Sequence, residues 1–415
     1  MLRSMHMRPA WTGGQYSVYR VLLSLLVASL LIDGARAATP VALGVALIGL
    51  SGPACLALAL GWRARAAGGL LGIALLVLTI AAAAPESDSL RARLVPELLV
   101  AGFLLALHLA TPHQPFGSWE ARTRPDPGGD WQLPPRVWQL TWLALGLLHG
   151  LAAFDVVPLS LDAAAGLRAS SPMASPSAPD GLPLEILALA GRGFDLFVLA
   201  AALHPPLRRA AWSAVLIWQI AWSAAIGWDA IAAGVWLTSL LAFDPGWLPP
   251  RSRALSGATE GAGGGAEAGA TTAPTACTAR LFYDGDCGFC HRSVRFVLAE
   301  ESPLRPDRLL HFAPLESRAF EALLERHPSL RGDLPDSIVL ELEDGTLRTR
   351  SAAVLEIAAR LGGLWRALAA LGSLLPRSVL DRAYDVVARV RKRIFARPKD
   401  SCPILPPGLR QRFDP

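Results

Sequence analysis

The sequence predicts two structural classes in one chain, a multi-span α-helical membrane domain followed by a smaller α/β domain. Of the 415 residues, 52% are hydrophobic and only 18% are charged, and the apolar residues crowd into the first 250 positions. Gly, Ala, Thr and Ser then dominate residues 251–276, a composition typical of a flexible linker. Short apolar runs alternate with helical patterns beyond it. We expect a membrane domain over 1–250, a linker over 251–276 and an α/β domain over 277–415.

Apolar runs long enough to cross a bilayer recur along the first domain. The expected spans are residues 16–32, 41–60, 66–84, 94–110, 137–157, 184–203, 210–226 and 228–243. The first run, followed by Ala35-Arg36-Ala37, also fits a cleaved signal peptide. We favour a retained span because further apolar segments follow at once, and the lipid bilayer is then the first expected partner.

Arginine placement predicts the orientation, because cytoplasmic loops of membrane proteins carry an excess of positive charge. With the N-terminus inside, eleven arginines fall on the cytoplasmic side and four on the other. The eleven are Arg3, Arg8, Arg63, Arg65, Arg122, Arg124, Arg136, Arg208, Arg209, Arg251 and Arg253, and the four are Arg36, Arg91, Arg93 and Arg168. Eight spans then leave the α/β domain in the cytoplasm. We expect a multi-pass protein of a bacterial-type inner membrane.

Charge and cysteine content exclude two classes of protein. The net charge is +5, but basic and aromatic residues are not interleaved as on a nucleic-acid surface, so no nucleic-acid partner is expected. The five cysteines are too few and too scattered for a secreted disulfide framework. They are Cys55, Cys277, Cys287, Cys290 and Cys402.

Charged residues inside the expected spans need partners, since each costs about 2.5–3.5 kcal/mol to insert at the centre of a membrane helix. Arg192 and Asp195 are three residues apart on one expected helix, so we expect an ion pair between them. A polar pocket for a quinone, a lipid head group or a proton path is the alternative. Cys55 is expected to be a small core residue.

The stretch LFYDGDCGFCHRSVRF, residues 281–296, carries the chemistry. Its first three residues are a short apolar run of strand type, and an Asp-Gly-Asp turn ends that run. Apolar residues then recur at helical spacing. Cys287 and Cys290 therefore fall on the first turn of a helix that begins where a strand ends.

This position predicts a redox pair. Unpaired amides and the macrodipole at a helix start stabilise a thiolate and lower its pKa. We expect Cys287, at the more exposed position, to be the nucleophile, and Cys290 to be the resolving thiol. The dithiol needs no further cofactor, and its partner is a thiol or disulfide of a protein or small molecule that the sequence does not identify.

Five neighbouring residues are candidates for supporting roles. His291 favours the thiolate when protonated, or it simply faces solvent. Asp284 and Asp286 oppose the thiolate if ionised nearby, and they can instead cap the helix or relay a proton. Gly285 completes the turn between them, and Tyr283 either packs the strand or lines the site.

The elements that follow predict the fold of the second domain. After the helix at the cysteines we expect a strand, a helix, a hairpin and a helix that Ser351 caps. Their ranges are 308–312, 316–326, 337–342 with 346–350, and 351–361. This β-α-β-α-β-β-α order is that of a thioredoxin-like fold. A further amphipathic helix over 376–395 is expected to pack on its own domain, with the anionic inner leaflet as the alternative.

Three motifs resemble the DCC family of thiol–disulfide oxidoreductases over about residues 279–405. They are Tyr-Asp-Gly-Asp-Cys-x-x-Cys at 283–290, Arg350-Ser351-x-Ala353, and Ala383-Tyr384-Asp385 with Ala388-Arg389. The resemblance implies a thioredoxin-like domain with a redox-active disulfide. Ala352 departs from the pattern, since the family usually has an acidic residue there.

The membrane domain is similar to the HTTM family at its two ends, in the segment WLTSLLAFDPGWLP at 236–249 and in Tyr-Arg-Val-Leu at 19–22. Members of that family include vitamin K-dependent γ-carboxylase, whose chemistry needs a lysine base. The first lysine of this chain is Lys392, so the resemblance does not imply carboxylase activity here.

Two other classes of function stay open. Cys277, Cys287, Cys290 and either His291 or Cys402 supply enough ligands for zinc or iron, although the chain has no second Cys-x-x-Cys; we expect no metal. A membrane scaffold or ligand-binding protein with a vestigial redox domain is the other alternative. Reversible oxidation and reduction of the cysteine pair would distinguish an oxidoreductase from a metal-binding module and from a scaffold or ligand-binding protein.

Overall fold

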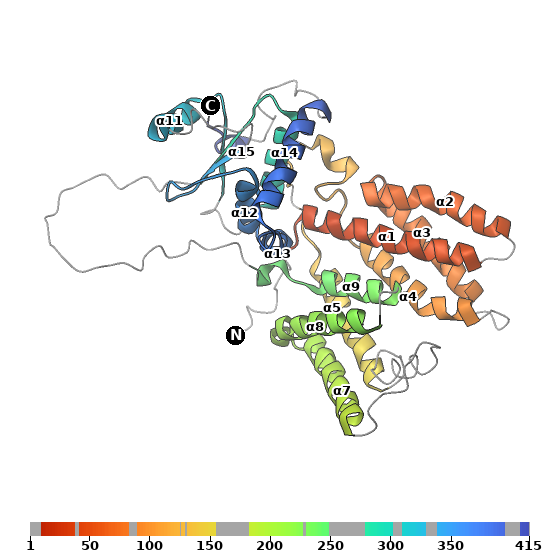
Figure 1. Ribbon diagram of the computed structural model, residues 1–415. Helices are drawn as coiled ribbons and strands as arrows, with labels where there is room; N and C mark the ends of the chain where they lie inside the picture. Colours follow the sequence, from red (N-terminus) through yellow and green to blue (C-terminus); the bar gives the residue numbers. More distant parts are fainter. Residues whose placement is uncertain are drawn as a thin grey trace. The chain divides into compact units, whose positions relative to one another are not determined.

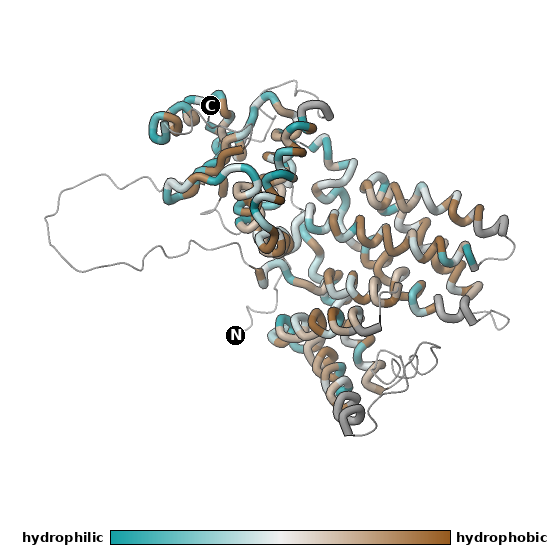
Figure 2. Tube along the Cα trace, viewed as in Figure 1, coloured by the Kyte–Doolittle hydropathy of each residue, from teal (hydrophilic) through white to brown (hydrophobic). Residues whose placement is uncertain are grey.

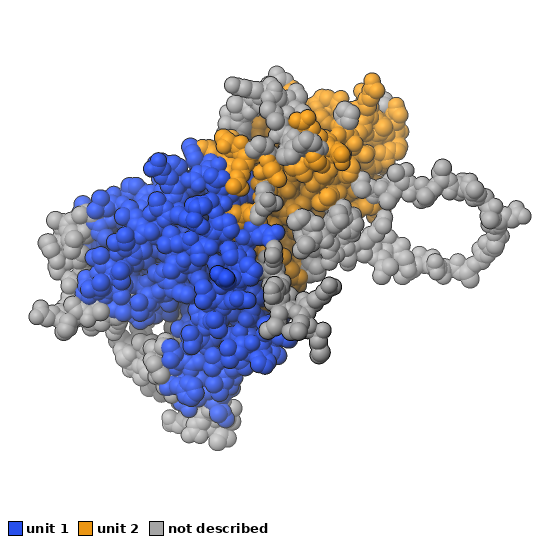
Figure 3. All heavy atoms as spheres, turned by 180° about the vertical axis from the view of Figure 1, so that it is seen from behind, with its two compact units in different colours: residues 1–9, 16–120, 132–244 blue, residues 10–15, 121–131, 245–415 orange. Residues whose placement is uncertain are grey.

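The computed structural model describes residues 10–37, 41–82, 89–124, 126–128, 131–154, 182–226, 230–248, 279–301, 309–328, 338–394 and 407–414. The chain forms two compact units, coloured separately in Figure 3. Unit 1 comprises residues 1–9, 16–120 and 132–244, and unit 2 comprises residues 10–15, 121–131 and 245–415. The linker expected over 251–276 and its boundaries lie outside the described residues, so they stay predictions.

Helices occupy all eight segments where spans were expected, and Figure 2 shows their largely hydrophobic colouring. They are α1 (Gly13–Ala37), α2 (Val41–Leu60), α3 (Ala64–Ala82), α4 (Ser89–Leu109), α5 (Pro135–Ala153), α7 (Leu182–Leu203), α8 (Arg208–Ile226) and α9 (Ala230–Ala242). Short 3-10 turns lie at η1 (Trp119–Thr123), η2 (Pro205–Leu207) and η3 (Pro245–Trp247).

Length and hydropathy single out fewer of these helices as membrane spans. Among the described residues, Gly13–Arg36 and Ala64–Ala82 are long and apolar enough to cross a membrane. Shorter apolar helices run over Leu47–Leu60, Val95–Leu109 and Ala230–Ala242. Two candidate spans do not confirm the expected count of eight, and the topology stays a prediction.

The ion pair expected between Arg192 and Asp195 stays a prediction. Asp195 Oδ1 lies 2.7 Å from His149 Nδ1, and both of these side chains are buried. Because α5 and α7 pack against each other, a residue of the neighbouring helix reaches the carboxylate, which was not expected. Cys55 is buried in α2, as expected of a core residue.

Unit 2 is built on a four-stranded mixed sheet with strand order β2-β1-β3-β4. The strands are β1 (Arg280–Tyr283), β2 (His311–Pro314), β3 (Val339–Glu341) and β4 (Leu347–Thr349). β1 runs parallel to β2 and antiparallel to β3, and β3 and β4 form the expected hairpin. The helices are α10 (Gly288–Glu300), α11 (Arg318–Arg326), α12 (Arg350–Leu361), α13 (Gly363–Gly372), α14 (Arg377–Ile394) and α15 (Pro407–Arg410), labelled in Figure 1 where space allows.

Alternation along β1 divides the core between two faces of the sheet. Leu281 and Tyr283 point to one face, in the same cluster as both cysteines of α10 and Ile357 of α12. Phe282 points to the other face, where it packs on Phe320 of α11 with ring centroids 5.1 Å apart. The sheet is thus covered by helices on both sides.

The predicted order of elements is confirmed, with three differences. β2 begins at His311 rather than at residue 308, and α13 was not predicted. The expected Ser351 cap is wrong, because α12 already begins at Arg350 with Thr349 as its N-cap residue. Helix α14 packs on its own unit as predicted, and Tyr384 Oη accepts a hydrogen bond of 3.1 Å from the Ile338 amide.

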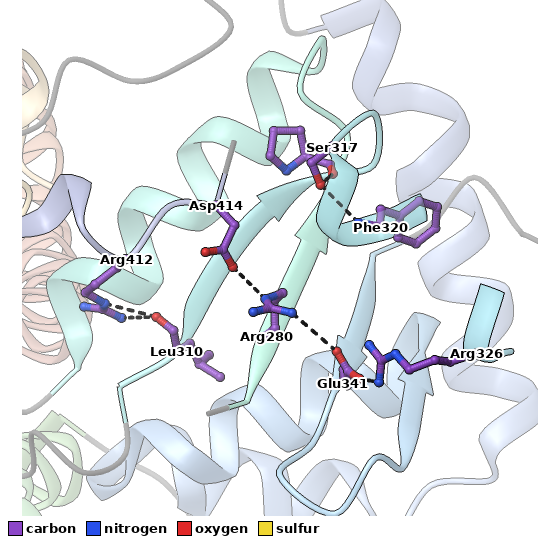
Figure 4. A network of polar contacts seen from close by, with 9 residues as sticks. Arg280, Leu310, Ser317, Phe320, Arg326, Glu341, Arg412 and Asp414 are labelled. Carbon is purple, nitrogen blue, oxygen red and sulfur yellow. Dashed lines mark hydrogen bonds and ion pairs between the residues drawn. The ribbon is translucent and has the colours of Figure 1, made fainter. Parts of the chain in front are cut away.

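The C-terminal segment extends the sheet beyond β2 (Figure 4). The Phe312 amide donates to the Arg412 carbonyl at 2.8 Å, and the Asp414 amide donates to the Phe312 carbonyl at 2.9 Å. Arg412 also donates to the Leu310 carbonyl and pairs with the Glu301 carboxylate. Residues 412–414 therefore cover an edge strand, whose amides would otherwise stay open to pairing.

Candidate functional site

The turn after β1 sets the position of the first cysteine. Asp284 Oδ1 accepts a hydrogen bond of 3.0 Å from the Asp286 amide, and the Asp284 carbonyl accepts one of 3.3 Å from the Cys287 amide. Gly285 is buried, and a Cβ there would lie 3.3 Å from Glu316 Oε2. The Asp-Gly-Asp sequence therefore closes a tight turn that brings Cys287 to the start of α10.

The two cysteines occupy the predicted places on the helix. Cys287 is the N-cap residue of α10, with φ −101° and ψ 112°, and its Sγ accepts a hydrogen bond from the Cys290 amide at 3.4 Å. The sulfur thus takes the place that a serine or aspartate oxygen usually fills at a helix start.

Exposure differs from the expectation for Cys287. Cys287 is 4% exposed and Cys290 is 3% exposed, so the two residues are almost equally buried. The reason is that the N-cap side chain folds back over the first helical turn and joins the core cluster on that face of the sheet. Both thiols are unpaired.

The environment of Cys290 holds it in the neutral form. Burial raises its pKa well above the ordinary value, and its interaction with the Cys287 sulfur raises the pKa further. The Arg391 guanidinium opposes this shift, whereas the Asp284 carboxylate adds to it. The second cysteine therefore stays protonated at neutral pH unless a reacting group is present.

His291 supports the turn rather than lying open to solvent. The ring is buried, its Nε2 donates a hydrogen bond of 2.8 Å to the Gly285 carbonyl, and it meets the Tyr283 ring edge-on at 5.8 Å. Tyr283 is itself buried in the core beneath the site. Asp286, in contrast, is exposed.

One residue of the site comes from a distant part of the sequence. Arg391 of α14 is buried, with its Nη2 3.7 Å from Asp284 Oδ2. The sequence places Arg391 in a basic run at the end of the amphipathic helix expected over 376–395. Its helical phase sets it apart from the other basic residues of that run, since Arg391 lies one helical turn after the apolar Val387.

The second and third sequence motifs meet each other in the structure. The Ser351 hydroxyl donates to Asp381 Oδ1, and Arg350 Nε lies 3.7 Å from Asp385 Oδ1. Arg350 also has a positive φ of 51°, a conformation that side chains other than glycine adopt uncommonly. These contacts join the start of α12 to α14 and so help to hold Arg391 over the site.

An apolar cavity of about 440 Å³ borders Cys290. Its walls come from β1, α10, α12, α13 and α14. They include Phe296 of α10, Trp365 of α13 and Val387 of α14. The polar groups of its lining include Cys290, Tyr384 and Arg391. This volume lies within the range of small-molecule sites, and it allows an apolar group to approach the second sulfur.

No cluster of three or more His, Cys, Asp or Glu side chains suited to a metal ion occurs within the described residues. Cys277 and Cys402, which the metal alternative requires, lie outside them. The arrangement of Cys287 and Cys290 is instead that of a dithiol at a helix start.

Known proteins resemble the C-terminal region. Residues 281–397 match the family described as DCC1-like thiol-disulfide oxidoreductase. A curated relative, Uncharacterized protein YuxK of Bacillus subtilis (strain 168), is 33% identical over 135 residues, which are 32% of this chain and 93% of the relative. No solved structure matches. The family match does not include residues 1–250, so the likeness of these residues to the HTTM family stays a prediction. Through its C-terminal region, the chain belongs to the DCC1-like thiol–disulfide oxidoreductase family.

Proposed function

We propose that unit 2 is a thioredoxin-like domain that exchanges thiols and disulfides, with Cys287 as the nucleophile and Cys290 as the resolving thiol. The observation that carries the proposal is the N-cap position of Cys287, whose sulfur accepts the Cys290 amide. The strand order, the parallel β1–β2 pair and the antiparallel hairpin support the fold assignment.

The reaction begins when the Cys287 thiolate attacks one sulfur of a substrate disulfide. That bond breaks, the leaving sulfur takes up a proton, and a mixed disulfide with Cys287 remains. Cys290 then loses its proton and attacks the Cys287 sulfur, which releases the second substrate thiol. Two electrons have passed to the substrate, and an external dithiol must reduce the Cys287–Cys290 disulfide before the next cycle.

The different environments of the two sulfurs suit these two roles. An amide stabilises negative charge on Cys287, whereas burial keeps Cys290 protonated until the mixed disulfide has formed. The cavity beside Cys290 favours substrates that carry an apolar group near the sulfur.

We further propose that the apolar helices of the N-terminal part anchor this activity to a bacterial-type inner membrane, with unit 2 in the cytoplasm. The two candidate spans and the arginine asymmetry support this arrangement. A reporter fused after Pro415 is expected to be active in the cytoplasm, and external activity of that fusion contradicts the orientation.

A redox titration of the full-length protein tests the chemistry. The protein is equilibrated in thiol–disulfide buffers of graded potential, and free thiols are then alkylated and located by mass spectrometry. We expect Cys287 and Cys290 to lose alkylation together in one two-electron transition. Independent behaviour of the two residues, or the absence of any disulfide between them under oxidising buffers, contradicts the proposal.

A further inference from the structure

A polar pocket of about 300 Å³ lies within unit 1, between α1, the turn that joins α2 to α3, and the segment that follows α4. Three arginines and two histidines contribute to its lining, together with a single acidic residue among the lining side chains that the structure describes. They are Arg20, Arg63, Arg65, His108, His113 and Glu120. The excess of positive charge indicates an anionic ligand.

Arg20 is the residue that makes this pocket a binding site. Its side chain is 1% exposed, and its Nη2 makes a long hydrogen bond of 3.4 Å to the Ala59 carbonyl. Its Nε and Nη1 have no hydrogen-bond partner within the part of the chain that the structure describes. A buried guanidinium is costly unless its charge and its N–H groups are matched. A ligand that supplies acceptor oxygens in the pocket removes this cost.

The surrounding residues pack closely around the guanidinium, and Glu120 and Tyr16 also act on its charge. Gly61 ends α2 with a φ of +70°, and a Cβ at this position would lie 2.8 Å from Arg20 Cζ. Beneath it, Tyr16 Oη lies 2.7 Å from His108 Nδ1, and the Thr111 hydroxyl donates to the His108 carbonyl. These polar groups are paired among themselves, and Arg20 is one of the residues that line the pocket.

Further donors converge from α3. Its first residues line the pocket, and the first amides of a helix lack intrahelical acceptors and favour anions. Arg65 donates to the Thr111 carbonyl and to His113 Nε2, both at 2.6 Å, which fixes its side chain over the same space. Glu120 is engaged at the rim, where its Oε1 accepts the Arg63 amide at 2.8 Å.

We propose that this pocket binds a phosphate group, as a phosphomonoester or phosphodiester. Donors that approach from an arginine edge and from a helix start suit a tetrahedral oxyanion, and paired arginine N–H groups bind phosphate strongly. Trp62 and Trp119, each next in sequence to lining residues, are 53% and 50% exposed. Exposed tryptophans are typical of the membrane interface, which favours a lipid head group over free phosphate as the source.

Thermal unfolding of the full-length protein in phospholipid-free maltoside micelles tests the proposal. The ligands are dihexanoyl phosphatidic acid, inorganic phosphate, and dihexanoylglycerol, which has the same chains without the phosphate. A ligand that binds the folded protein raises the unfolding temperature saturably. We expect this with phosphatidic acid and not with dihexanoylglycerol. An equal affinity for inorganic phosphate supports the site and identifies free phosphate as the source. Failure of both phosphate ligands to bind, or an equal response to dihexanoylglycerol, overturns the proposal.

Variants locate the binding in the pocket. Arg20→Met is expected to weaken the apparent affinity for phosphatidic acid about tenfold or more, because a charge-assisted contact is lost. Arg63→Gln, at the exposed rim, is expected to weaken it about two- to fivefold. Arg36→Gln, an exposed change further along α1, is the matched control and should bind as the wild type does. If Arg20→Met does not fold, the affinity of Arg63→Gln for phosphatidic acid tests whether the ligand binds in this pocket. Unchanged affinity in every folded pocket variant overturns the proposal.

Discussion

Two buried arginines, one in each unit, show opposite uses of the same side chain. Arg391 lies 3.7 Å from the Asp284 carboxylate beside the thiols of Cys287 and Cys290, at the edge of an apolar cavity. Arg20 is just as buried, yet two of its nitrogens lack partners within the described residues. The first charge has a carboxylate 3.7 Å away inside the protein, whereas we propose that a ligand supplies the oxyanion partner of the second.

The difference between Arg391 and Arg20 predicts that one residue contributes to folding and the other to binding. A buried ion pair makes each partner necessary, because removing one leaves the other uncompensated. Arg20 has one long hydrogen bond to a carbonyl, so an apolar replacement is expected to cost the fold little. The buried arginines of unit 2 are therefore expected to matter for stability, and Arg20 for ligand affinity.

The largest effect is expected for Arg412→Met at the C-terminal strand. This change removes the partner of the buried Glu301 carboxylate and the hydrogen bonds to the Leu310 carbonyl. We expect unit 2 to lose about 3–5 kcal/mol of its free energy of unfolding at neutral pH. Hydrogen exchange of the β1 and β2 amides, measured by mass spectrometry in the full-length protein, reports this loss.

Gln411→Ala is the control, because its side chain is exposed one residue away, and it should change stability by less than about 0.5 kcal/mol. Burial raises the pKa of Glu301, and Arg412 lowers it. The variant therefore raises that pKa further, so the loss of stability should shrink as the pH falls and the carboxyl becomes neutral. Equal protection of wild type and Arg412→Met contradicts the pairing.

The next effect concerns the alkylation rate of Cys290. Because burial raises its pKa, its thiolate fraction should still be rising at pH values where an ordinary thiol, with a pKa of about 8.5, is fully ionised. Asp284→Asn removes a charge that raises this pKa, and Arg391→Met removes one that lowers it. We expect the first variant to alkylate faster and the second slower, by up to about tenfold each.

Peptide-resolved mass spectrometry after timed iodoacetamide treatment, from pH 7 to pH 10, measures these rates. Asp286→Asn is the matched control, since this carboxylate is exposed. Shifts of the same sign in the Asp284 and Arg391 variants contradict the electrostatic account.

The smallest effect is expected for Arg20→Met in the absence of phosphate. Since two of its nitrogens lack partners within the described residues, we expect the unfolding temperature in phospholipid-free micelles to stay close to that of the wild type, or to rise. A large loss of stability without ligand would show that Arg20 is matched inside the protein, and the contrast with Arg391 would then fail.

Much of unit 2 could be predicted because its signals are local. The strand, the Asp-Gly-Asp turn and the helix start at Cys287 follow one another within a few residues, and Glu343-Asp344-Gly345 closes the hairpin as expected. Each depends on turn chemistry and on apolar spacing, which the sequence displays directly. The helices of the first 250 residues were found for the same reason.

The parts that sequence reasoning missed depend on contacts between distant residues. Arg391 meets Asp284 across more than a hundred residues, and the last strand-like segment docks on β2 through backbone hydrogen bonds and the Arg412–Glu301 pair. His149 meets Asp195 because two helices pack together. The buried state of Cys287 likewise follows from how its own helix lies on the sheet, which helical spacing alone does not give.

Trapping of mixed disulfides tests the central claim most directly. In Cys290→Ser the adduct on Cys287 has no internal thiol to release it, so we expect reductant-sensitive, high-mass species in cells that express the full-length variant. Cys287→Ser should give few or none, and Cys402→Ser combined with Cys290→Ser should still trap. Adducts that require Cys402 and not Cys287, or equal trapping by both single variants, would contradict the assignment of Cys287 as the nucleophile.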